Sequence, residues 1–442
     1  MVLGLLISTA LAGRIEPLRK GRDSQRLIVA FFEDSSVVAE DGVELDILKD
    51  HNAAPLFARS VPELSADAKQ YGVDLRRFVQ ITGMSSELDE LWSLLAQRKD
   101  VEHLYYAFLP VPPPSDVSPQ TPDFSDQQIY LGEAPDGFAI DALFGVEGVW
   151  GSGIKIADLE YSWDPFHEDL TTSPEDFAWG WDIENWTFHG NGVLGILISQ
   201  DNGYGVTGIV PNASALMISP FEDEDVYTVA AAVDASGDLL SPGDVLLIEQ
   251  QGYDFGLYCP VEWDPAVFEA ISLLTAKGIH VVEPAGNGSF DLDDPLWDGW
   301  FDREHDSGAI FVGAGASPFS DVVPMGFVDG GSNYGSRLDL QGWYTDIVTV
   351  GGDGFADLFH PDNDHQQAYT EMFGGTSGAA AQIAGLVASA NGMSLARSGA
   401  PWEPYALRSA LKTATLPFPP DETHWLGERP DMRLFFALFG SY

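Results

Sequence analysis

Three segments of this chain carry the residue types that attack by a serine requires. Ser377 lies in the run Gly-Gly-Thr-Ser-Gly-Ala-Ala, just before an apolar helical stretch. His189 begins His-Gly-Asn-Gly-Val, and Asp158 ends the strand-like run Ile-Lys-Ile-Ala-Asp. A serine hydroxyl is a weak nucleophile, so it needs an imidazole to take its proton and a carboxylate to orient that imidazole. The order along the chain is Asp, His, Ser.

A fourth segment, Ala-Gly-Asn-Gly, places Asn287 after an apolar strand-like run. Acyl transfer requires a hydrogen-bond donor aimed at the tetrahedral oxyanion, and the loss of one such donor costs about 3–4 kcal/mol. Ser377 itself opens a helix, whose N-terminus brings partial positive charge close to the same oxygen. Taken alone, however, an asparagine between glycines is more typical of a left-handed turn than of an oxyanion donor.

These motifs and their order resemble those of the subtilisin-like serine proteases, or subtilases. The serine motif is similar to the Gly-Thr-Ser-x-Ala-x-Pro of that family, with Ala381 at the proline position. His-Gly-Asn-Gly-Val is similar to the family's His-Gly-Thr-x-Val. The run His-Glu-Asp-Leu at 167–170 resembles the His-Pro-Asp-Leu that follows the family's aspartate.

The resemblance implies a Ser-His-Asp triad of Ser377, His189 and Asp158, with Asn287 in the oxyanion hole. It implies that Gln250, Gln251 and Gly252 hold the substrate backbone and that Ala285 and Gly286 form the other wall of the specificity pocket. The chain departs from the family after Asp158, where Leu159 and Glu160 replace Ser or Thr and Gly. Glu160 is expected to raise the pKa of the histidine, to bind a cation, or to point away.

The chain divides at a proline-rich stretch, residues 110–122, which predicts an exposed linker. Residues 24–109 predict a small α+β domain, with strands at 27–32, 77–81 and 101–108. Joined in this way to a peptidase domain at 123–442, it resembles a subtilase propeptide, although an ordinary accessory domain fits the pattern too. Residues 1–12 are apolar and end Ala-Leu-Ala, which indicates a short signal segment.

From residue 123 onward, strand and helix patterns alternate. Short apolar runs at 154–157, 215–218, 245–248, 280–282, 310–312 and 347–350 predict buried strands, and residues 226–240 and 266–277 predict helices. Alternation of this kind predicts an α/β fold with a mostly parallel sheet and helices on both faces. Ligand sites in such sheets lie at the carboxyl ends of the strands, where Asp158 and Asn287 are expected.

Charge is the dominant feature of the composition. With 21 Lys and Arg against 68 Asp and Glu, the net charge is −47. Such a surface repels nucleic acid and anionic membranes, so no nucleic-acid partner is expected. No apolar run is long enough for a membrane span. The single cysteine, Cys259, excludes an intrachain disulfide.

No cofactor is needed for serine chemistry. Acidic clusters at 222–225, 291–294 and 362–364 offer the oxygen ligands that calcium prefers, and the family resemblance adds an expectation of structural calcium, although solvated acidic loops are the simpler interpretation. His360 and His365 flank the last cluster without an evident third ligand for zinc.

The leading hypothesis is a secreted serine endopeptidase that acts on polypeptides through an acyl-enzyme and is made as a zymogen, with the N-terminal domain as intramolecular inhibitor and chaperone. A subtilase-fold binding or scaffold protein that no longer cleaves is the alternative. An α/β-hydrolase esterase needs Asp and His after the serine, and only His424 follows it. A Ser-Glu-Asp peptidase of the sedolisin kind conflicts with the His189 motif.

Overall fold

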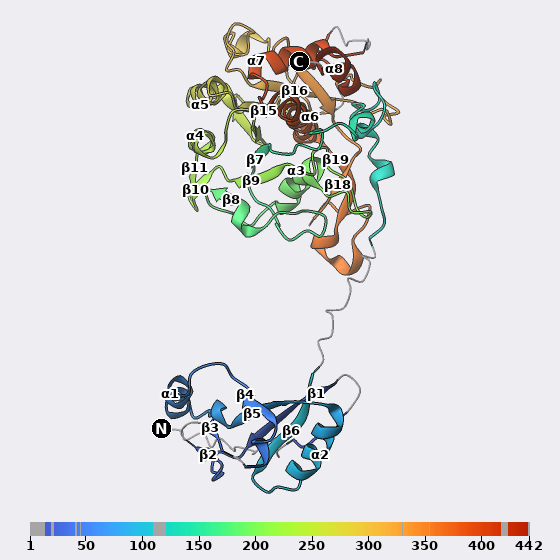
Figure 1. Ribbon diagram of the computed structural model, residues 1–442. Coiled ribbons are helices and arrows are strands. Elements are labelled where there is room, and N and C mark those ends of the chain that lie inside the picture. Colours follow the sequence, from blue (N-terminus) through green and yellow to red (C-terminus); the bar gives the residue numbers. More distant parts are fainter. Residues whose placement is uncertain are drawn as a thin grey trace. The chain divides into compact units, whose positions relative to one another are not determined.

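The computed structural model describes residues 14–18, 22–39, 42–44, 46–108, 121–328, 330–352, 354–416 and 423–440. The chain forms two compact units, residues 1–117 and residues 118–442 (Figure 1). The signal segment expected at 1–12 lies outside the described residues, as does most of the linker expected at 110–122.

The N-terminal unit is an antiparallel sheet packed against helices. Strand β1 (Arg22–Phe31) is central and pairs with β5 (Phe78–Thr82) and β6 (Val101–Phe108) in the order β4-β5-β1-β6. Alternate residues of β1, among them Leu27 and Val29, share one apolar core with the buried face of α2. The other elements are β2 (Val38–Ala39), β3 (Gly42–Val43), β4 (Asn52–Pro55), α1 (Val61–Tyr71) and α2 (Ser85–Leu95).

A seven-stranded sheet forms the centre of the C-terminal unit, and all of its strand pairs are parallel. The strand order is β17-β16-β15-β12-β7-β9-β8. Most of these strands are buried on both faces, which is why they read as continuous apolar runs in the sequence. Their bounds are β7 (Lys155–Leu159), β8 (Phe177–Trp179), β9 (Ser214–Ile218), β12 (Val245–Ile248), β15 (His280–Pro284), β16 (Ile310–Gly315) and β17 (Leu340–Trp343).

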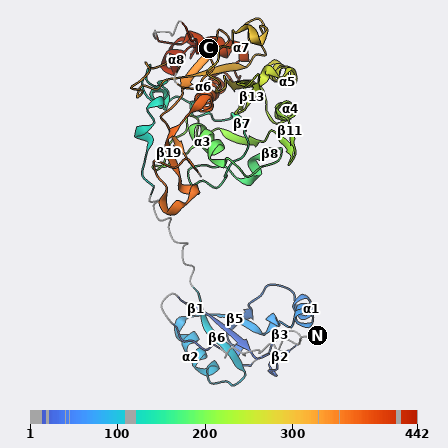
Figure 2. The same ribbon diagram turned by 180° about the vertical axis from the view of Figure 1, so that it is seen from behind.

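Helices cover both faces of this sheet, as Figures 1 and 2 show from opposite sides. Ile156 and Leu247 join the core beneath α3 and α6, whereas their neighbours Ala157 and Leu246 join the core beneath α4 and α5. The predicted α/β fold class is therefore confirmed. The helices are α3 (Thr187–Ile198), α4 (Val229–Leu239), α5 (Pro265–Ala276), α6 (Gly375–Ser398), α7 (Pro404–Thr413) and α8 (Met432–Phe439).

One predicted strand has an unexpected partner, and one predicted helix has the wrong start. The run at 347–350 is a strand, β18 (Ile347–Val350), but it pairs antiparallel with β19 (Tyr369–Phe373), and β17 takes the edge of the main sheet. The predicted helix at 226–240 starts later, because Thr228 accepts a hydrogen bond from the Ala231 amide and caps α4. The residues before it form β11 (Val226–Tyr227), which pairs with β10 (Phe221–Asp223).

One further hairpin, β13 (Gln251–Asp254) and β14 (Leu257–Pro260), follows β12 directly. It lies at the carboxyl ends of β7, β12 and β15, which are adjacent in the sheet. Ligand sites of open parallel sheets form at this edge. Within the part of the chain that the structure describes, no helix combines the length and apolar character that crossing a membrane requires.

Candidate active site

Ser377 stands in the first turn of α6, a helix buried over most of its length. Gly375 precedes it with φ 75°, a left-handed conformation that side chains other than glycine rarely adopt. A methyl group at Gly374 would lie 2.1 Å from the Tyr344 carbonyl oxygen. The glycine pair is therefore required for the sharp turn that presents Ser377, half-buried, at the helix N-terminus.

His189 lies in the first turn of α3, and its Nδ1 atom makes a short hydrogen bond with the carboxylate of Glu160. The Glu160 side chain is 2% exposed and that of His189 is 30% exposed. Burial lowers the pKa of His189, but the charge of Glu160, the hydrogen bond to it and the charge of Asp158 raise it by more, so the net pKa lies above its usual value. The imidazole is thus oriented by a glutamate.

Asp158, the residue predicted to orient the histidine, makes no hydrogen bond with it. Its Oδ2 atom accepts a hydrogen bond from Trp163 Nε1 at 2.8 Å, and Oδ1 has no partner among the described residues. Asp158 is fully buried, and burial, followed by the charge of Glu160, raises its pKa well above the usual value. The predicted contact between Asp158 and His189 is therefore wrong.

The physical reason is the length of β7. The prediction ended this strand at Asp158, but Leu159 continues it, pairing with Ile248 on one side and Ile218 on the other. Residues two apart on a strand face the same way, so Asp158 and Glu160 share a face, and Glu160 is the one at the carboxyl end. The signal was present in the sequence, since the apolar Leu159 indicates that the buried strand goes on.

Asn287 follows β15, and its side-chain orientation is set by the nucleophile helix. The Thr376 amide donates to Asn287 Oδ1 at 3.0 Å, which leaves Nδ2 as the donor available to the cleft. Gln251 Oε1 occupies this position, accepting from the Asn287 backbone amide at 2.9 Å and from Nδ2 at 3.4 Å. The predicted oxyanion donor is thus engaged by a side-chain carbonyl of the chain's own hairpin.

The segments predicted to form the two walls of a specificity pocket both lie against strand β14. A methyl group at Gly252 would lie 3.0 Å from Cys259 Sγ, and one at Gly286 would lie 3.3 Å from the Cys259 carbonyl carbon. Strand β14 therefore runs between the walls, and Ala285 beside it is completely buried. Gln250 also turns inward, with its Oε1 accepting from the Tyr227 hydroxyl at 2.9 Å.

A cleft of about 430 Å³ brings these elements together. Its lining includes Glu160, His189, Asn287 and Ser377, and a groove of about 840 Å³ continues from it. Ser377 and His189 line the cleft without a hydrogen bond between them, and such bonds often tighten only when substrate binds. Residues that the sequence analysis did not assign to the site also line it: Tyr161, Trp186, Phe188, Glu249, Tyr258, Pro284 and Thr376.

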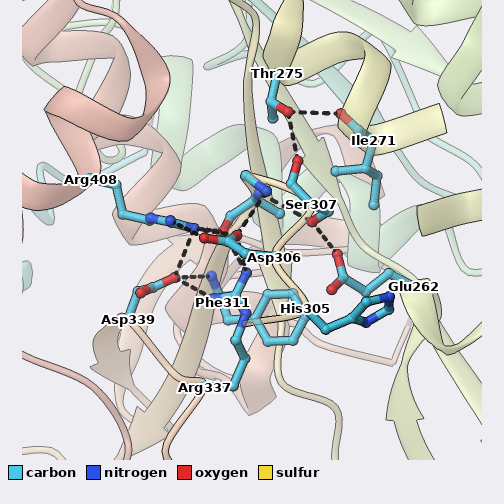
Figure 3. A network of polar contacts seen from close by, with 12 residues as sticks. Glu262, Ile271, Thr275, His305, Asp306, Ser307, Phe311, Arg337, Asp339 and Arg408 are labelled. Carbon is cyan, nitrogen blue, oxygen red and sulfur yellow. Dashed lines mark hydrogen bonds and ion pairs between the residues drawn. The ribbon is translucent and has the colours of Figure 1, made fainter. Parts of the chain in front are cut away.

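A network of charges lies where β16 and β17 begin, at the edge of the parallel sheet opposite this cleft (Figure 3). Arg337 donates to Asp339 at 2.7 Å and to Asp306 at 3.1 Å, and its guanidinium lies 4.2 Å from the centre of the Phe311 ring. Arg408, on α7, donates to Asp306 at 2.5 Å. The network therefore ties α7 to the ends of β16 and β17.

Residues of the acidic clusters considered as calcium ligands accept hydrogen bonds from backbone amides in turns and caps. Asp291 accepts from the Asp293 amide, Asp294 caps a short 3-10 helix by accepting from the Leu296 amide, and Asp223 accepts from two following amides. Among the described residues, no three His, Cys, Asp or Glu side chains gather closely enough to hold a metal ion.

Comparison with known families matches residues 115–429 to the subtilase family. The chain belongs to this family. The "Major intracellular serine protease" of Bacillus subtilis (strain 168) is 25% identical over 186 residues, which are 37% of this chain and 52% of that protein. The chain thus matches about half the length of this relative.

Two solved structures share the fold of this subtilase. A protease from Pseudoalteromonas arctica PAMC 21717 matches with a TM-score of 0.52 and 20% identity, covering 72% of this chain and 99% of that one. Fervidolysin from Fervidobacterium pennivorans, described as a keratinolytic enzyme related to subtilisin, matches with a TM-score of 0.50 and 17% identity, covering 96% of this chain and 63% of that one. At these identities the likeness concerns the fold.

Proposed function

We propose that this subtilase is a serine endopeptidase with Ser377 as nucleophile, His189 as general base and Glu160 as the orienting acid. The observation that carries the proposal is the hydrogen bond between Glu160 and His189 Nδ1 at the edge of the sheet where Ser377 also lies. A carboxylate on Nδ1 holds the proton there and leaves Nε2 free to accept one.

In the proposed reaction, Ser377 Oγ attacks the peptide carbonyl while His189 Nε2 takes the serine proton. The imidazolium formed is stabilised by Glu160 and passes its proton to the leaving amine, giving an acyl-enzyme. Water, activated by the same imidazole, then releases the acid. Asn287 Nδ2 and the Ser377 amide donate to the oxyanion, and for this Gln251 must first leave Asn287.

Polypeptides are the proposed substrates because the cleft opens into a longer groove. The groove shares Tyr161, Trp186 and Gln251 with the cleft and runs along β13. An extended chain fits such a channel better than a compact small molecule does, which favours an endopeptidase over an esterase.

We further propose that the protein is a secreted zymogen whose N-terminal unit inhibits the peptidase unit and assists its folding. The presence of a separately folded unit before the peptidase supports this. The test is to incubate the purified full chain and follow its mass and its peptidase activity. Full activity in a chain that never shortens would contradict the zymogen, and a cytosolic protein that retains its first residues would contradict secretion.

A non-catalytic binding protein is the second candidate function. The observations that favour it are that β14 fills the space between the pocket walls and that Gln251 engages Asn287. In that case the cleft would recognise a partner without cleaving it.

A fluorophosphonate probe distinguishes the two functions, because it labels only an activated serine. We expect labelling of the full-length protein at Ser377, located by peptide mapping, and its loss in Ser377→Ala. Absence of labelling in folded protein, before and after any spontaneous shortening, would overturn the peptidase and support the binding protein.

A further inference from the structure

Glu249 is the first residue after β12, next to Glu160 at the carboxyl edge of the sheet. Its backbone amide donates to the Leu159 carbonyl at 2.9 Å, which continues the pairing of β12 with β7. Leu247, two residues earlier, packs in the core beneath α3 and α6. Because residues two apart on a strand share a face, Glu249 faces the same two helices, which carry His189 and Ser377.

The Glu249 carboxyl group is buried without a counter-charge. The residue is 6% exposed, and neither side-chain oxygen makes a hydrogen bond of good geometry within the described structure. Asp158 and Glu160 are the charged groups that act on it, and both have its own sign. No lysine or arginine lines the cleft. A carboxylate in such a position is costly unless it keeps a proton.

The Ser377 hydroxyl is a neutral polar group that acts on this carboxyl. Both residues line the cleft, together with His189. Burial, then the charges of Asp158 and Glu160, raise the pKa of Glu249 well above its usual value, and the Ser377 hydroxyl lowers it in part. The serine therefore has two potential partners, the imidazole of His189 and the carboxyl of Glu249.

We propose that Glu249 is a positioning residue for the nucleophile, and that only its protonated form lets Ser377 react. This inference rests on the proposed peptidase function. A protonated carboxyl donates its O–H to Ser377 Oγ and leaves the serine hydrogen directed at His189. An ionised carboxylate accepts the serine hydrogen instead and turns the hydroxyl away from the imidazole. Glu249 keeps its own proton throughout the reaction, while the serine proton passes to His189 and then to the leaving amine.

The test is the pH dependence of kcat/KM for a peptide substrate, measured with the full-length protein as purified. Wild type is expected to lose activity about tenfold per pH unit above the ionisation of Glu249, as a single required proton dictates. Glu249→Gln donates an amide hydrogen and cannot ionise. Its kcat/KM is expected to show no such alkaline decline.

Glu283→Gln is the matched control, because Glu283 is equally buried with a raised pKa but interacts with Glu262 rather than with Ser377. It is expected to keep the alkaline decline. Glu249→Ser, smaller and also a hydrogen donor, replaces Glu249→Gln if that variant does not fold; far-ultraviolet circular dichroism decides this.

Three outcomes would overturn the inference: an unchanged alkaline decline in folded Glu249→Gln or Glu249→Ser, loss of activity at every pH in both, or the same flattening in Glu283→Gln. Fluorophosphonate labelling of each variant separates these results from failure of the proposed function. A wild type that hydrolyses no peptide and takes no label refutes the peptidase itself, and the inference with it.

Discussion

Two neighbouring carboxylates, Glu160 and Asp158, could orient His189. Which of them does so decides how the proposed catalytic site works. Glu160 contacts Nδ1, whereas Asp158, two residues earlier, is bound to Trp163 Nε1. A glutamate has one more methylene than an aspartate, and here it starts from a position at the end of the strand rather than inside it. Its extra length and its later position both bring the carboxylate to the first turn of α3.

Replacing each acid by its amide separates the two roles. Glu160→Gln should lower kcat about 10³- to 10⁴-fold, because the imidazole loses the partner that holds its tautomer. Asp158→Asn should lower kcat less than about tenfold, since it changes only the electrostatic potential at His189. Steady-state kinetics on both variants is the measurement. A larger loss in Asp158→Asn than in Glu160→Gln would contradict the assignment of Glu160.

The variants Glu160→Gln and Asp158→Asn should also shift the acid limb of the pH profile of kcat/KM. Glu160 raises the pKa of His189, so the neutral imidazole required for attack forms only above its usual range. Removing either negative charge lowers that pKa, and the acid limb of kcat/KM moves to lower pH. The shift should be larger for Glu160→Gln, whose contribution to the His189 pKa exceeds that of Asp158.

At the scale of elements, the β13–β14 hairpin contacts the proposed oxyanion donor, Asn287. Gln251 starts β13, and its side chain engages Asn287 while β14 fills the space beside Gly286. Gln251→Ala should raise kcat/KM and the rate of fluorophosphonate labelling about fivefold, since displacing one hydrogen bond costs about 1 kcal/mol. Gln250→Ala, at the inward-facing neighbour, should give no gain. Slower labelling of Gln251→Ala would indicate that Gln251 assists catalysis.

The charged network of Figure 3 makes a second prediction at this scale. Asp339 is 2% exposed and accepts from Arg337 and Lys412, each at 2.7 Å. Asp339→Ala leaves Arg337 buried without its main counter-charge, and the loss in free energy of unfolding should be about 3–5 kcal/mol. Glu133→Ala, which breaks an exposed pair with Arg433, should cost less than about 1 kcal/mol. Urea denaturation compares the two, and equal losses would contradict the structural role of the network.

At the scale of the whole molecule, buried carboxyl groups set the dependence of stability on pH. Burial raises the pKa of Asp169 to about 7 and, with neighbouring negative charges, raises those of Asp158, Glu249 and Glu283 well above usual. These groups stay protonated in the folded chain at pH values where the unfolded chain has ionised them. The folded state then binds more protons, so stability falls as pH rises.

The free energy of unfolding should therefore be highest in mild acid and decline from about pH 4 through pH 7 and beyond. Asp169 alone contributes up to about 4 kcal/mol to this decline, from a shift of about three pKa units. Asp306 has the opposite dependence. Arg408 and Arg337 hold its pKa at about 2 against the effect of burial, so its contribution to stability is lost only as the pH falls below about 4. Urea denaturation at pH 5 and pH 8 tests this, and greater stability at pH 8 would contradict it.

The local sequence was enough to select Ser377, His189 and Asn287 as candidate site residues. The structure places all three around one cleft. Their signals are short runs of glycine and small residues whose backbone requirements are local. The alternation of apolar strands and helices likewise predicted the parallel sheet, because burial on both faces leaves its mark on each strand separately.

Only the tertiary structure decided which carboxylate reaches His189. Leu159 signals that β7 continues, but the contact itself joins the end of this strand to the first turn of α3, 29 residues later in the chain. The filled space beside Gly286 and the contact of Gln251 with Asn287 join segments more than 25 residues apart. Glu249 gives no local signal either. Its role follows from lying beside Glu160 across a strand pair, and adjacency of that kind is a property of the folded sheet.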